Sequence, residues 1–244
     1  MIPLSYDLHI HSCLSPCGDE DMTPANIAGM AAVKELDVIA LTDHNTSRNC
    51  APFLKMAEAY GLVGLPGMEL TTNEDVHVVC LFPDLYAAMD FDTYVYNRMF
   101  KIANKEHIFG AQLLYNENDE IIGKEPNLLI TNAAINFEDV FDLTEERGGI
   151  MIPAHIDKSA NSLISNLGFV PPDSQFLCAE LKDLNKLPEL KKSNPYLNYC
   201  NIITNSDAHC LEHINERENF LQAKSRSVSD ILHALKCLNS CIDR

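Results

Sequence analysis

The chain has 244 residues, of which 46% are hydrophobic and 22% charged, and this allows one sizeable folded core. Its formal net charge is −17, because 35 acidic residues outnumber 18 basic ones. Such a negative field repels a polyphosphate backbone, so we expect long nucleic acid not to be the main partner. No stretch approaches the roughly 20 apolar residues of a membrane span, and residues 1–10 lack a basic leader. We expect a cytoplasmic protein without membrane association; the sequence does not indicate its oligomeric state.

The nine cysteines include no Cys-x-x-Cys pair. An odd count in a chain of this size, without an export signal, is not typical of a secreted disulfide scaffold. Cys13 and Cys17 are four residues apart but have no third cysteine nearby, which disfavours an iron–sulfur cluster. We therefore expect reduced thiols with structural roles.

Short apolar runs and helix signals alternate along the first third of the chain. Strands are predicted at residues 5–11, 38–42, 62–70 and 76–82, because short apolar runs are typical of buried strands. Thr23 and Pro24 supply an N-cap and a proline at the first helical position, which predicts a helix to about residue 36. A second helix is predicted at residues 52–60, ended by Gly61.

Residues from about 84 to 149 have a different character. We predict a helix at residues 92–106, a hairpin over residues 113–122 that turns at residues 116–119, and a helix from an Asn136 cap to Gly148. We interpret this segment as an insertion or cap within a single domain that spans residues 1–244.

Alternation of strands and helices resumes after that segment. Strands are predicted at residues 150–155, 176–181 and 202–205, and Ser229 is expected to cap a last helix. Repeated strand–helix units are typical of a parallel sheet or barrel. The sequence therefore predicts an α/β protein.

Histidines and carboxylates recur in or beside the predicted strand ends. His9 and His11 are two residues apart on a strand, so both imidazoles point to one face and can bind one metal ion. The other candidates follow in chain order: His44, Glu69, His77, His155, Asp207 and His209. A single His-x-His pair or a single histidine is more often structural than not. Their recurrence at strand ends, where barrel enzymes hold their active sites, instead predicts a metal centre.

These residues lie in motifs that resemble those of the PHP (polymerase and histidinol phosphatase) superfamily, closest to its small stand-alone phosphoesterases. Four motifs carry the resemblance: Asp-Leu-His9-Ile-His11 with the acidic loop after it, Leu-Thr-Asp-His44-Asn, Gly-Met-Glu69 with His77, and Pro-Ala-His155 with Asn-Ser-Asp207-Ala-His209. The resemblance covers nearly the whole chain, and the middle insertion least. It implies a distorted (β/α)7 TIM-like barrel with an inserted helix and hairpin segment.

The resemblance also implies three positions for divalent metal ions. The first position would use His9, His11, Glu69 and Asp207; the second Glu69, His77 and His155, with Glu69 bridging; and the third Asp19, His44 and His209. Glu20 and Asp21 remain open as alternatives to Asp19, because the loop after His11 is longer than is usual in the family. Imidazole and carboxylate ligands suit iron, manganese or zinc, so we expect two to three ions of these metals.

We therefore expect a metal-dependent phosphoesterase that hydrolyses a small phosphomonoester or nucleotide phosphate by attack of a metal-bridging hydroxide. Glu69, Asp207 and His209 are the expected catalytic residues. Lys158 and Arg48 lie near the motifs and are candidates for binding the phosphate, although a solvated surface role fits them equally well. Two alternatives remain open: an amidohydrolase-like metal hydrolase, which also opens with His-x-His, and a non-catalytic, metal-bound regulatory module.

Overall fold

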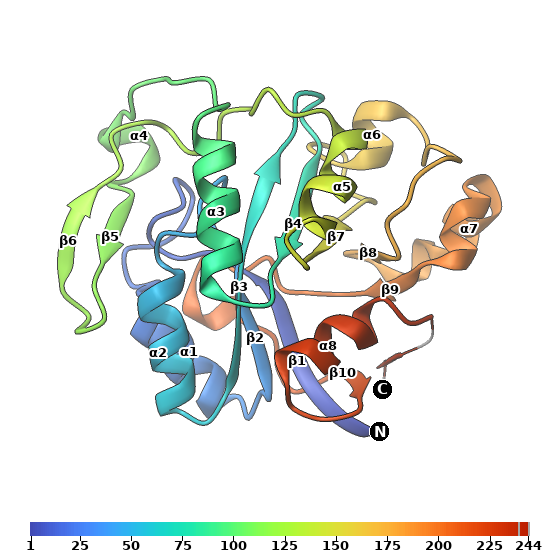
Figure 1. Ribbon diagram of the computed structural model, residues 1–244, viewed down its shortest axis with the longest axis horizontal. Helices are drawn as coiled ribbons and strands as arrows, with labels where there is room; N and C mark the ends of the chain where they lie inside the picture. The colour runs from blue at the N-terminus through green and yellow to red at the C-terminus, as the bar shows by residue number, and fades with distance from the viewer. Residues whose placement is uncertain (239, 244) are drawn as a thin grey trace.

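A seven-stranded mixed sheet is the framework of the molecule (Figure 1). The computed structural model describes residues 1–238 and 240–243. In their order across the sheet, the strands are β11 (Cys241–Asp243), β10 (Asn219–Ala223), β1 (Ile2–Ile10), β2 (Val38–Leu41), β3 (Val63–Thr71), β4 (His77–Leu81) and β7 (Ile150–Pro153). Strands β1, β2 and β3 run parallel, whereas β10 pairs antiparallel with β1 and β11, and β4 with β3 and β7.

The sheet curls around an apolar interior. A two-stranded parallel sheet, made of β8 (Cys178–Glu180) and β9 (Asn201–Ile203), lies between its two ends, since β8 contacts β7 and β9 contacts β11. Side chains from both sheets, such as Leu8, Val79 and Ile203, pack in one buried cluster. An interior filled by alternate residues of each strand is typical of barrels. The predicted α/β class is confirmed, and the sheet forms a curled half-barrel. The predicted seven strand–helix units are not confirmed, because four of the strand pairs in the sheet are antiparallel.

Helices pack on the outer face of the sheet (Figure 1), except the last one, whose Ile231, Leu232 and Leu235 join the interior cluster. The α-helices are α1 (Pro24–Val33), α2 (Cys50–Ala59), α3 (Leu85–Tyr96), α4 (Glu106–Phe109), α5 (Val140–Glu145), α6 (Leu163–Leu167), α7 (Leu187–Ser193) and α8 (Val228–Leu235). Short 3-10 helices cover Phe137–Asp139, Leu184–Lys186, Pro195–Tyr199 and Leu211–His213. Within the described residues, no helix has both the length and the apolar character that crossing a membrane requires.

Capping residues explain where the predicted helix boundaries hold and where they do not. Thr23 accepts a hydrogen bond from the Asn26 amide, which confirms the predicted start of α1. The cap of α8 is Ser227 rather than the predicted Ser229, because the Ser227 hydroxyl accepts from the Asp230 amide. The predicted helix at residues 92–106 is also wrong in its bounds. Asp84 caps α3, which begins seven residues earlier than predicted and ends at Tyr96.

The segment after α3 leaves the helix to pair with another part of the insertion. Isolated bridges join Met99 to Ala133 and Ala103 to Asn127 in antiparallel fashion. Backbone pairing over residues 99–104 thus replaces the helical hydrogen bonds that the sequence predicted there. The predicted hairpin is present as β5 (Leu113–Tyr115) and β6 (Ile121–Lys124).

Polar side chains of the loop after β2 hold residues 113–131 against the sheet. The Asn45 side-chain amide donates to the carbonyls of Leu129 and Thr131, at 2.7 and 2.8 Å. The Asn49 amide donates to the Leu113 carbonyl at 3.1 Å. These bonds hold residues 128–131 over the carboxyl ends of β2 and β3, which are the strand ends that carry predicted metal ligands.

Arg48 lies in the same contact between the loop after β2 and residues 84–149. Its guanidinium donates to the Glu125 carboxylate, lies 3.6 Å from the Asp92 carboxylate and stacks 4.2 Å from the centre of the Tyr96 ring. Both carboxylates are buried. Burial alone would lower the pKa of Arg48, but Asp92 and Glu125 outweigh it and raise the pKa. Arg48 therefore compensates two buried negative charges.

Replacing Arg48 tests this role. Arg48→Ala leaves Asp92 and Glu125 without their cation, and we expect it to lower the free energy of unfolding by about 3 kcal/mol in urea titrations. Arg98→Ala is the matched control, because Arg98 is exposed and stacks on Tyr94 without a buried carboxylate. It should cost no more than about 1 kcal/mol. Equal losses in the two variants would contradict the role.

Candidate metal centre

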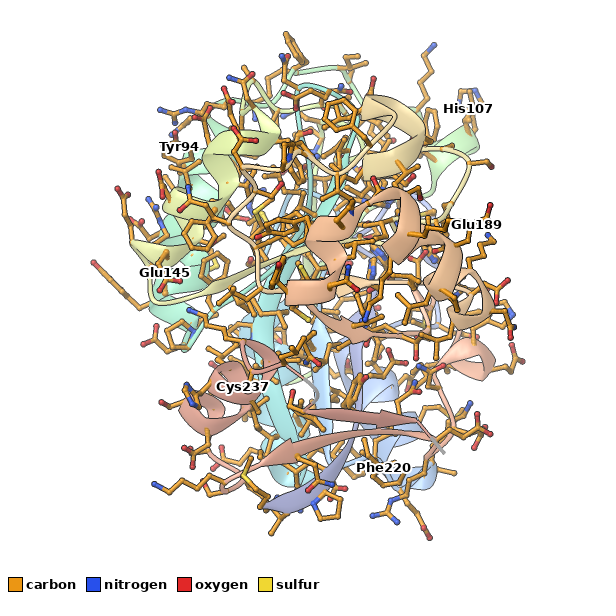
Figure 2. All side chains as sticks on the ribbon, turned by 90° about the vertical axis from the view of Figure 1, so that its right-hand side faces the viewer. Tyr94, His107, Glu145, Glu189, Phe220 and Cys237 are labelled. Carbon is orange, nitrogen blue, oxygen red and sulfur yellow. The ribbon has the colours of Figure 1, made fainter. Side chains whose placement is uncertain are left out.

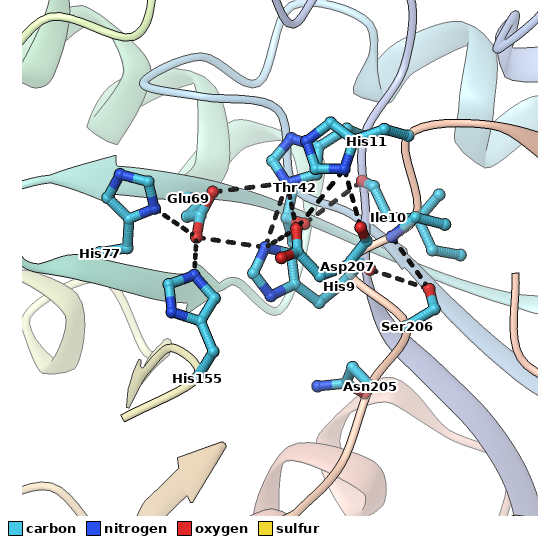
Figure 3. Close-up of polar contacts among 12 residues, drawn as sticks. His9, Ile10, His11, Thr42, Glu69, His77, His155, Asn205, Ser206 and Asp207 are labelled. Carbon is cyan, nitrogen blue, oxygen red and sulfur yellow. Dashed lines mark hydrogen bonds and ion pairs between the residues drawn. The ribbon is translucent and has the colours of Figure 1, made fainter. Parts of the chain in front are cut away.

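The Glu69 carboxylate lies at the centre of the predicted ligands (Figure 3). The residue is 1% exposed and sits near the carboxyl end of β3. Five imidazole nitrogens surround its two oxygens: His77 Nδ1 at 2.9 Å, His155 Nε2 at 3.0 Å and His9 Nε2 at 3.3 Å from Oε1, and His44 Nδ1 at 3.0 Å and His11 Nε2 at 3.4 Å from Oε2. One buried carboxylate is thus shared by five histidines from four strand ends.

Three overlapping groups of side chains bring candidate ligand atoms within 4.8 Å of one another. They are His9, His11, Glu69 and Asp207; His44, Glu69 and His77; and His11, His44 and His209. The first group is the set predicted for the first ion. In the second group His44 joins Glu69 and His77, while His155 is outside the group and contacts Glu69 Oε1, the oxygen that His77 also contacts. Because the groups share members, they form one connected cluster.

Unpaired polar atoms show that this cluster fits metal ions. Glu69 Oε2, His44 Nδ1 and His155 Nδ1 are buried and have no hydrogen-bond partner. The first two atoms lie 3.0 Å apart, but their geometry is not that of a hydrogen bond. A buried polar atom left unpaired costs about 1–3 kcal/mol, and a divalent cation between such atoms would satisfy both. Nitrogen and carboxylate oxygen donors suit iron, manganese and zinc.

The carboxylates of the cluster raise the pKa values of two histidines. Burial alone would lower the pKa of His11, but Asp207 and Glu69 outweigh it and raise the pKa to about 9. Burial also opposes protonation of His9, whose pKa Glu180, Glu69 and Asp207 nevertheless raise well above its ordinary value. In return, the histidines hold the pKa values of Glu69 and Asp207 far below the usual range, against the effect of burial. The cluster therefore attracts positive charge.

Two other histidines are neutral. Burial lowers the pKa of His44 to about 3, and burial together with the charge of His11 lowers that of His209 to about 4. Neutral imidazole is the form that binds metal ions. These two side chains are therefore ready to act as ligands at neutral pH.

Glu180 orients the His9 ring, and the sequence analysis did not identify it. The carboxylate ends β8, is 1% exposed and accepts a hydrogen bond from His9 Nδ1 at 3.0 Å. It also accepts from the backbone amide of His155 at 3.1 Å and from the Asn205 side chain at 2.7 Å. A carboxylate on Nδ1 directs the Nε2 lone pair at the metal site. The available signal was a glutamate closing an apolar strand, as Glu69 does.

Ser15 and Asp43 orient the His11 ring in the same way. The Ser15 hydroxyl donates to the Asp43 carboxylate at 2.7 Å and lies 3.0 Å from His11 Nδ1. Because a hydroxyl has one hydrogen, Ser15 must accept from His11 Nδ1, which leaves Nε2 free for a metal ion. The sequence analysis did not place Ser15 or Asp43 in the site, since serine and aspartate after a strand are equally typical of turns.

The backbone is strained at two ligands. His155 has a φ of 30° and Asp207 a φ of 54°, both in the left-handed region that side chains disfavour. Such conformations cost about 1–3 kcal/mol each and persist where the surroundings hold them. The bond from the His155 amide to Glu180 is one such restraint. In these conformations His155 Nε2 lies 3.0 Å from Glu69 and Asp207 Oδ1 lies 3.3 Å from His11 Nε2.

The remaining predicted residues lie at different distances from the cluster. The Asp19 side chain is exposed and accepts from the Asp21 amide at 3.1 Å, and Asp19 belongs to none of the three groups. Glu20 and Asp21 are exposed as well. Lys158 lines the site and donates to the Asp207 carboxylate. Arg48 is engaged in the junction with the insertion and does not line the site.

A cavity of about 270 Å3 opens over the cluster. Its walls are formed by Cys17, His44, Glu69, His77, Ile130, His155, Lys158, Ala160, Asn161, Asp207 and His209. Ile130 lies within residues 84–149, so this segment contributes to the cavity wall. A larger cavity of about 460 Å3, lined by Phe137, Phe141 and Phe176, contains none of the cluster residues.

A model of the PHP domain family matches residues 7–243, which include every ligand of the cluster. The chain belongs to the PHP family. The family prediction made from the four motifs is therefore confirmed.

Two known proteins are similar to part of the chain. An uncharacterized protein of Methanocaldococcus jannaschii is 36% identical over 76 residues, which are 28% of this chain and 44% of that protein. The 5′-3′ exoribonuclease Rnm of Escherichia coli is 33% identical over 85 residues, 33% of this chain and 28% of the enzyme. The chain thus matches less than half the length of either protein.

The crystal structure of the lesion-specific endonuclease Q from Pyrococcus furiosus has a similar fold. The TM-score is 0.68 at 18% identity, and the match covers 99% of this chain and 58% of that one. Because two of these three proteins are named as nucleases, the comparisons do not support our exclusion of nucleic acid, nor a small substrate.

Removing the charge of Glu180 tests its orienting role. Glu180→Gln keeps the shape of the side chain but weakens the hold on His9 Nδ1, and we expect metal affinity to fall about 10–100-fold in competition with a chelator. Glu189→Gln is the control, because Glu189 is exposed on α7, away from the cluster (Figure 2). An affinity within about twofold of wild type in the Glu180 variant would argue against the role.

Proposed function

We propose that this PHP protein is a metal-dependent phosphoesterase that hydrolyses a small phosphomonoester or nucleotide phosphate. The observation that carries the proposal is the buried Glu69 carboxylate, surrounded by five imidazoles at the floor of an open cavity. Bound divalent ions would supply Lewis acidity and activate water near neutral pH. Two to three ions, of iron, manganese or zinc, agree with three overlapping ligand groups.

Glu69, Asp207 and His209 have separate roles in this proposal. Glu69 would hold two ions together through its two oxygens, and Asp207 would complete the group of His9 and His11. His209 Nδ1 lies 2.8 Å from the Asp207 carbonyl. Because a carbonyl only accepts, Nδ1 carries the proton and the Nε2 lone pair is free to serve as a ligand.

Lys158 is the proposed contact for the substrate's phosphate. Its ammonium group lies on the cavity wall, and its side chain is 38% exposed. It donates to Asp207, whose other oxygen belongs to the first ligand group. A lysine held beside a metal ligand can reach a phosphate oxygen that binds the same ions. Arg48, in contrast, stabilises the insertion and is not part of this proposal.

The size of the cavity supports a small reacting group. About 270 Å3 is less than the roughly 300–1,000 Å3 of pockets that enclose a drug-sized ligand. A phosphate with its ester oxygen would fit, while the rest of a nucleotide would extend into the opening. The same cavity also admits the terminal phosphate of an oligonucleotide, and two similar proteins are named as nucleases. Oligonucleotides are therefore the second candidate substrates.

Metal removal tests the proposed centre. Chelation should abolish hydrolysis and lower the melting temperature, because an ion that binds the folded state stabilises it by mass action. Manganese, iron or zinc added back should restore both. Elemental analysis before and after chelation gives the stoichiometry. A preparation free of metal that remains active would end the proposal.

Glu69→Gln tests the catalytic role on a panel of substrates. The panel contains nucleoside monophosphates, a small phosphomonoester, short single-stranded oligonucleotides, and carboxylic amides and esters. Each is assayed with added manganese. We expect phosphate release, and a rate at least about 100-fold lower in Glu69→Gln, because the charge that holds two ions together is lost. Glu58→Gln, exposed on α2, should match wild type.

Each other outcome of the panel has a clear meaning. Hydrolysis of amides alone would favour the amidohydrolase-like alternative. Cleavage of oligonucleotides alone would replace the small substrate with nucleic acid. Metal binding without turnover of any substrate would favour a regulatory module.

A further inference from the structure

The larger cavity lies on the outer face of the sheet, beside β7. Alternate residues of this strand point to opposite sides, so Ile150 and Ile152 join the interior cluster, whereas Met151 joins the outer one and lines the cavity. The short helices α5 and α6 contribute Phe141 and Leu167 to the wall (Figure 1). The volume of about 460 Å3 falls within the roughly 300–1,000 Å3 of pockets that hold a small organic ligand.

Aromatic side chains give this cavity an apolar wall with a fixed shape. Phe137 is 5% and Phe176 1% exposed, and the centres of their rings lie 6.3 Å apart with the ring planes at 78°. The Phe137 amide donates to the Glu74 carboxylate at 2.9 Å, and the Tyr196 hydroxyl donates to the Phe176 carbonyl at 2.8 Å. The backbone that carries both rings is therefore held in place, and the apolar surface is formed before any ligand binds.

The charged side chains of the same wall are all acidic. They are Glu74, Glu138 and Asp173, and the described residues that line the cavity include no lysine, arginine or histidine. Glu138 and Asp173 are exposed, whereas Glu74 is half-buried. Carboxylates and the faces of aromatic rings both attract cations and repel anions. Within the described part of the chain, none of the three carboxylates belongs to a group that could hold a metal ion. The wall therefore suits an organic cation rather than a metal ion or a phosphate.

We propose that this cavity binds a small organic cation, a primary ammonium group on an apolar body, at a site separate from the metal centre. The apolar body packs against Phe137 and Phe176, and the ammonium group lies among the carboxylates of the wall. The two cavities of the protein then select opposite charges, because the metal-loaded centre attracts phosphate and this one repels it. This site does not depend on hydrolysis at the metal centre.

Three probes with one phenylethyl body and different charges test the proposal. Metal-loaded protein is titrated in a calorimeter with 2-phenylethylamine, which is a cation at neutral pH, with the neutral 2-phenylethanol and with the anion 3-phenylpropanoate. We expect the amine to bind at one site per chain, at least about fivefold more tightly than the alcohol, because it adds charge attraction to the same apolar contacts. The anion should bind more weakly than the alcohol.

Variants of the wall identify where the amine binds. The double variant Glu138→Gln/Asp173→Asn should reduce the preference for the amine over the alcohol to about twofold or less, and leave the affinity for the alcohol unchanged. The matched control is Glu58→Gln/Glu189→Gln, which removes two exposed carboxylates on α2 and α7. It changes the net charge equally and should keep the full preference. Phe141→Ala should weaken binding of the amine and the alcohol alike, and circular dichroism checks that each variant is folded.

Several outcomes would overturn the proposal. One is equal affinity for the amine and the alcohol, and another is no saturable binding of the amine in the millimolar range. A third is an equal loss of preference in the two double variants, which would indicate general attraction to the acidic protein. Amine binding that is lost in Glu69→Gln but kept in the wall variants would place the amine at the metal centre instead. None of these results bears on hydrolysis, which is measured independently.

Discussion

The burial of one carboxylate among five imidazoles is the constraint on which the rest of the site depends. An isolated ionised carboxylate inside a protein is strongly unfavourable, so Glu69 requires positive charge around it. Without metal ions, protons on His9 and His11 supply that charge, as the raised pKa values of both rings indicate. Divalent ions would displace these protons from the same nitrogens. Metal binding and proton release are therefore coupled at this centre.

The fold meets this constraint by placing ligands at several strand ends and holding them with buried carboxylates. Glu180 at the end of β8 orients His9, and Asp43 after β2 acts on His11 through Ser15. Each orienting group is paired, since Glu180 also accepts from Asn205 and Asp43 from the Ser12 amide. Carboxylates thus lie both within the cluster, as Glu69 does, and behind its histidines, as Glu180 and Asp43 do. The arrangement favours cations over neutral ligands and gives each imidazole one tautomer.

The sequence indicated which side chains gather in the cluster better than it indicated the groups around them, for a physical reason. His9 and His11 follow the two-residue period of a strand, and His-x-His at a strand end is a rare combination with a direct chemical meaning. Glu180 gave no such signal, because its partners come from β1 and from the segment after β9, far away in the sequence. The direction of Asp19 depends on turns of a loop whose length varies, so spacing alone could not determine it. The antiparallel pairing of β4 with β3, in contrast, follows from the short connection over residues 72–76, because a parallel pair requires a crossover of a dozen or more residues.

The charge of the molecule links substrate binding to metal binding. The chain carries a net charge of −17, and the cavity wall contributes Glu69 and Asp207. Among the described residues of that wall, Lys158 alone bears a permanent positive charge, and Asp207 already compensates it. A phosphate dianion that approaches the metal-free cluster therefore meets repulsion and no unpaired cation of the chain. On the proposed function, most of the affinity for phosphate would therefore come from the bound ions, and Lys158 would add a contact from the cavity wall.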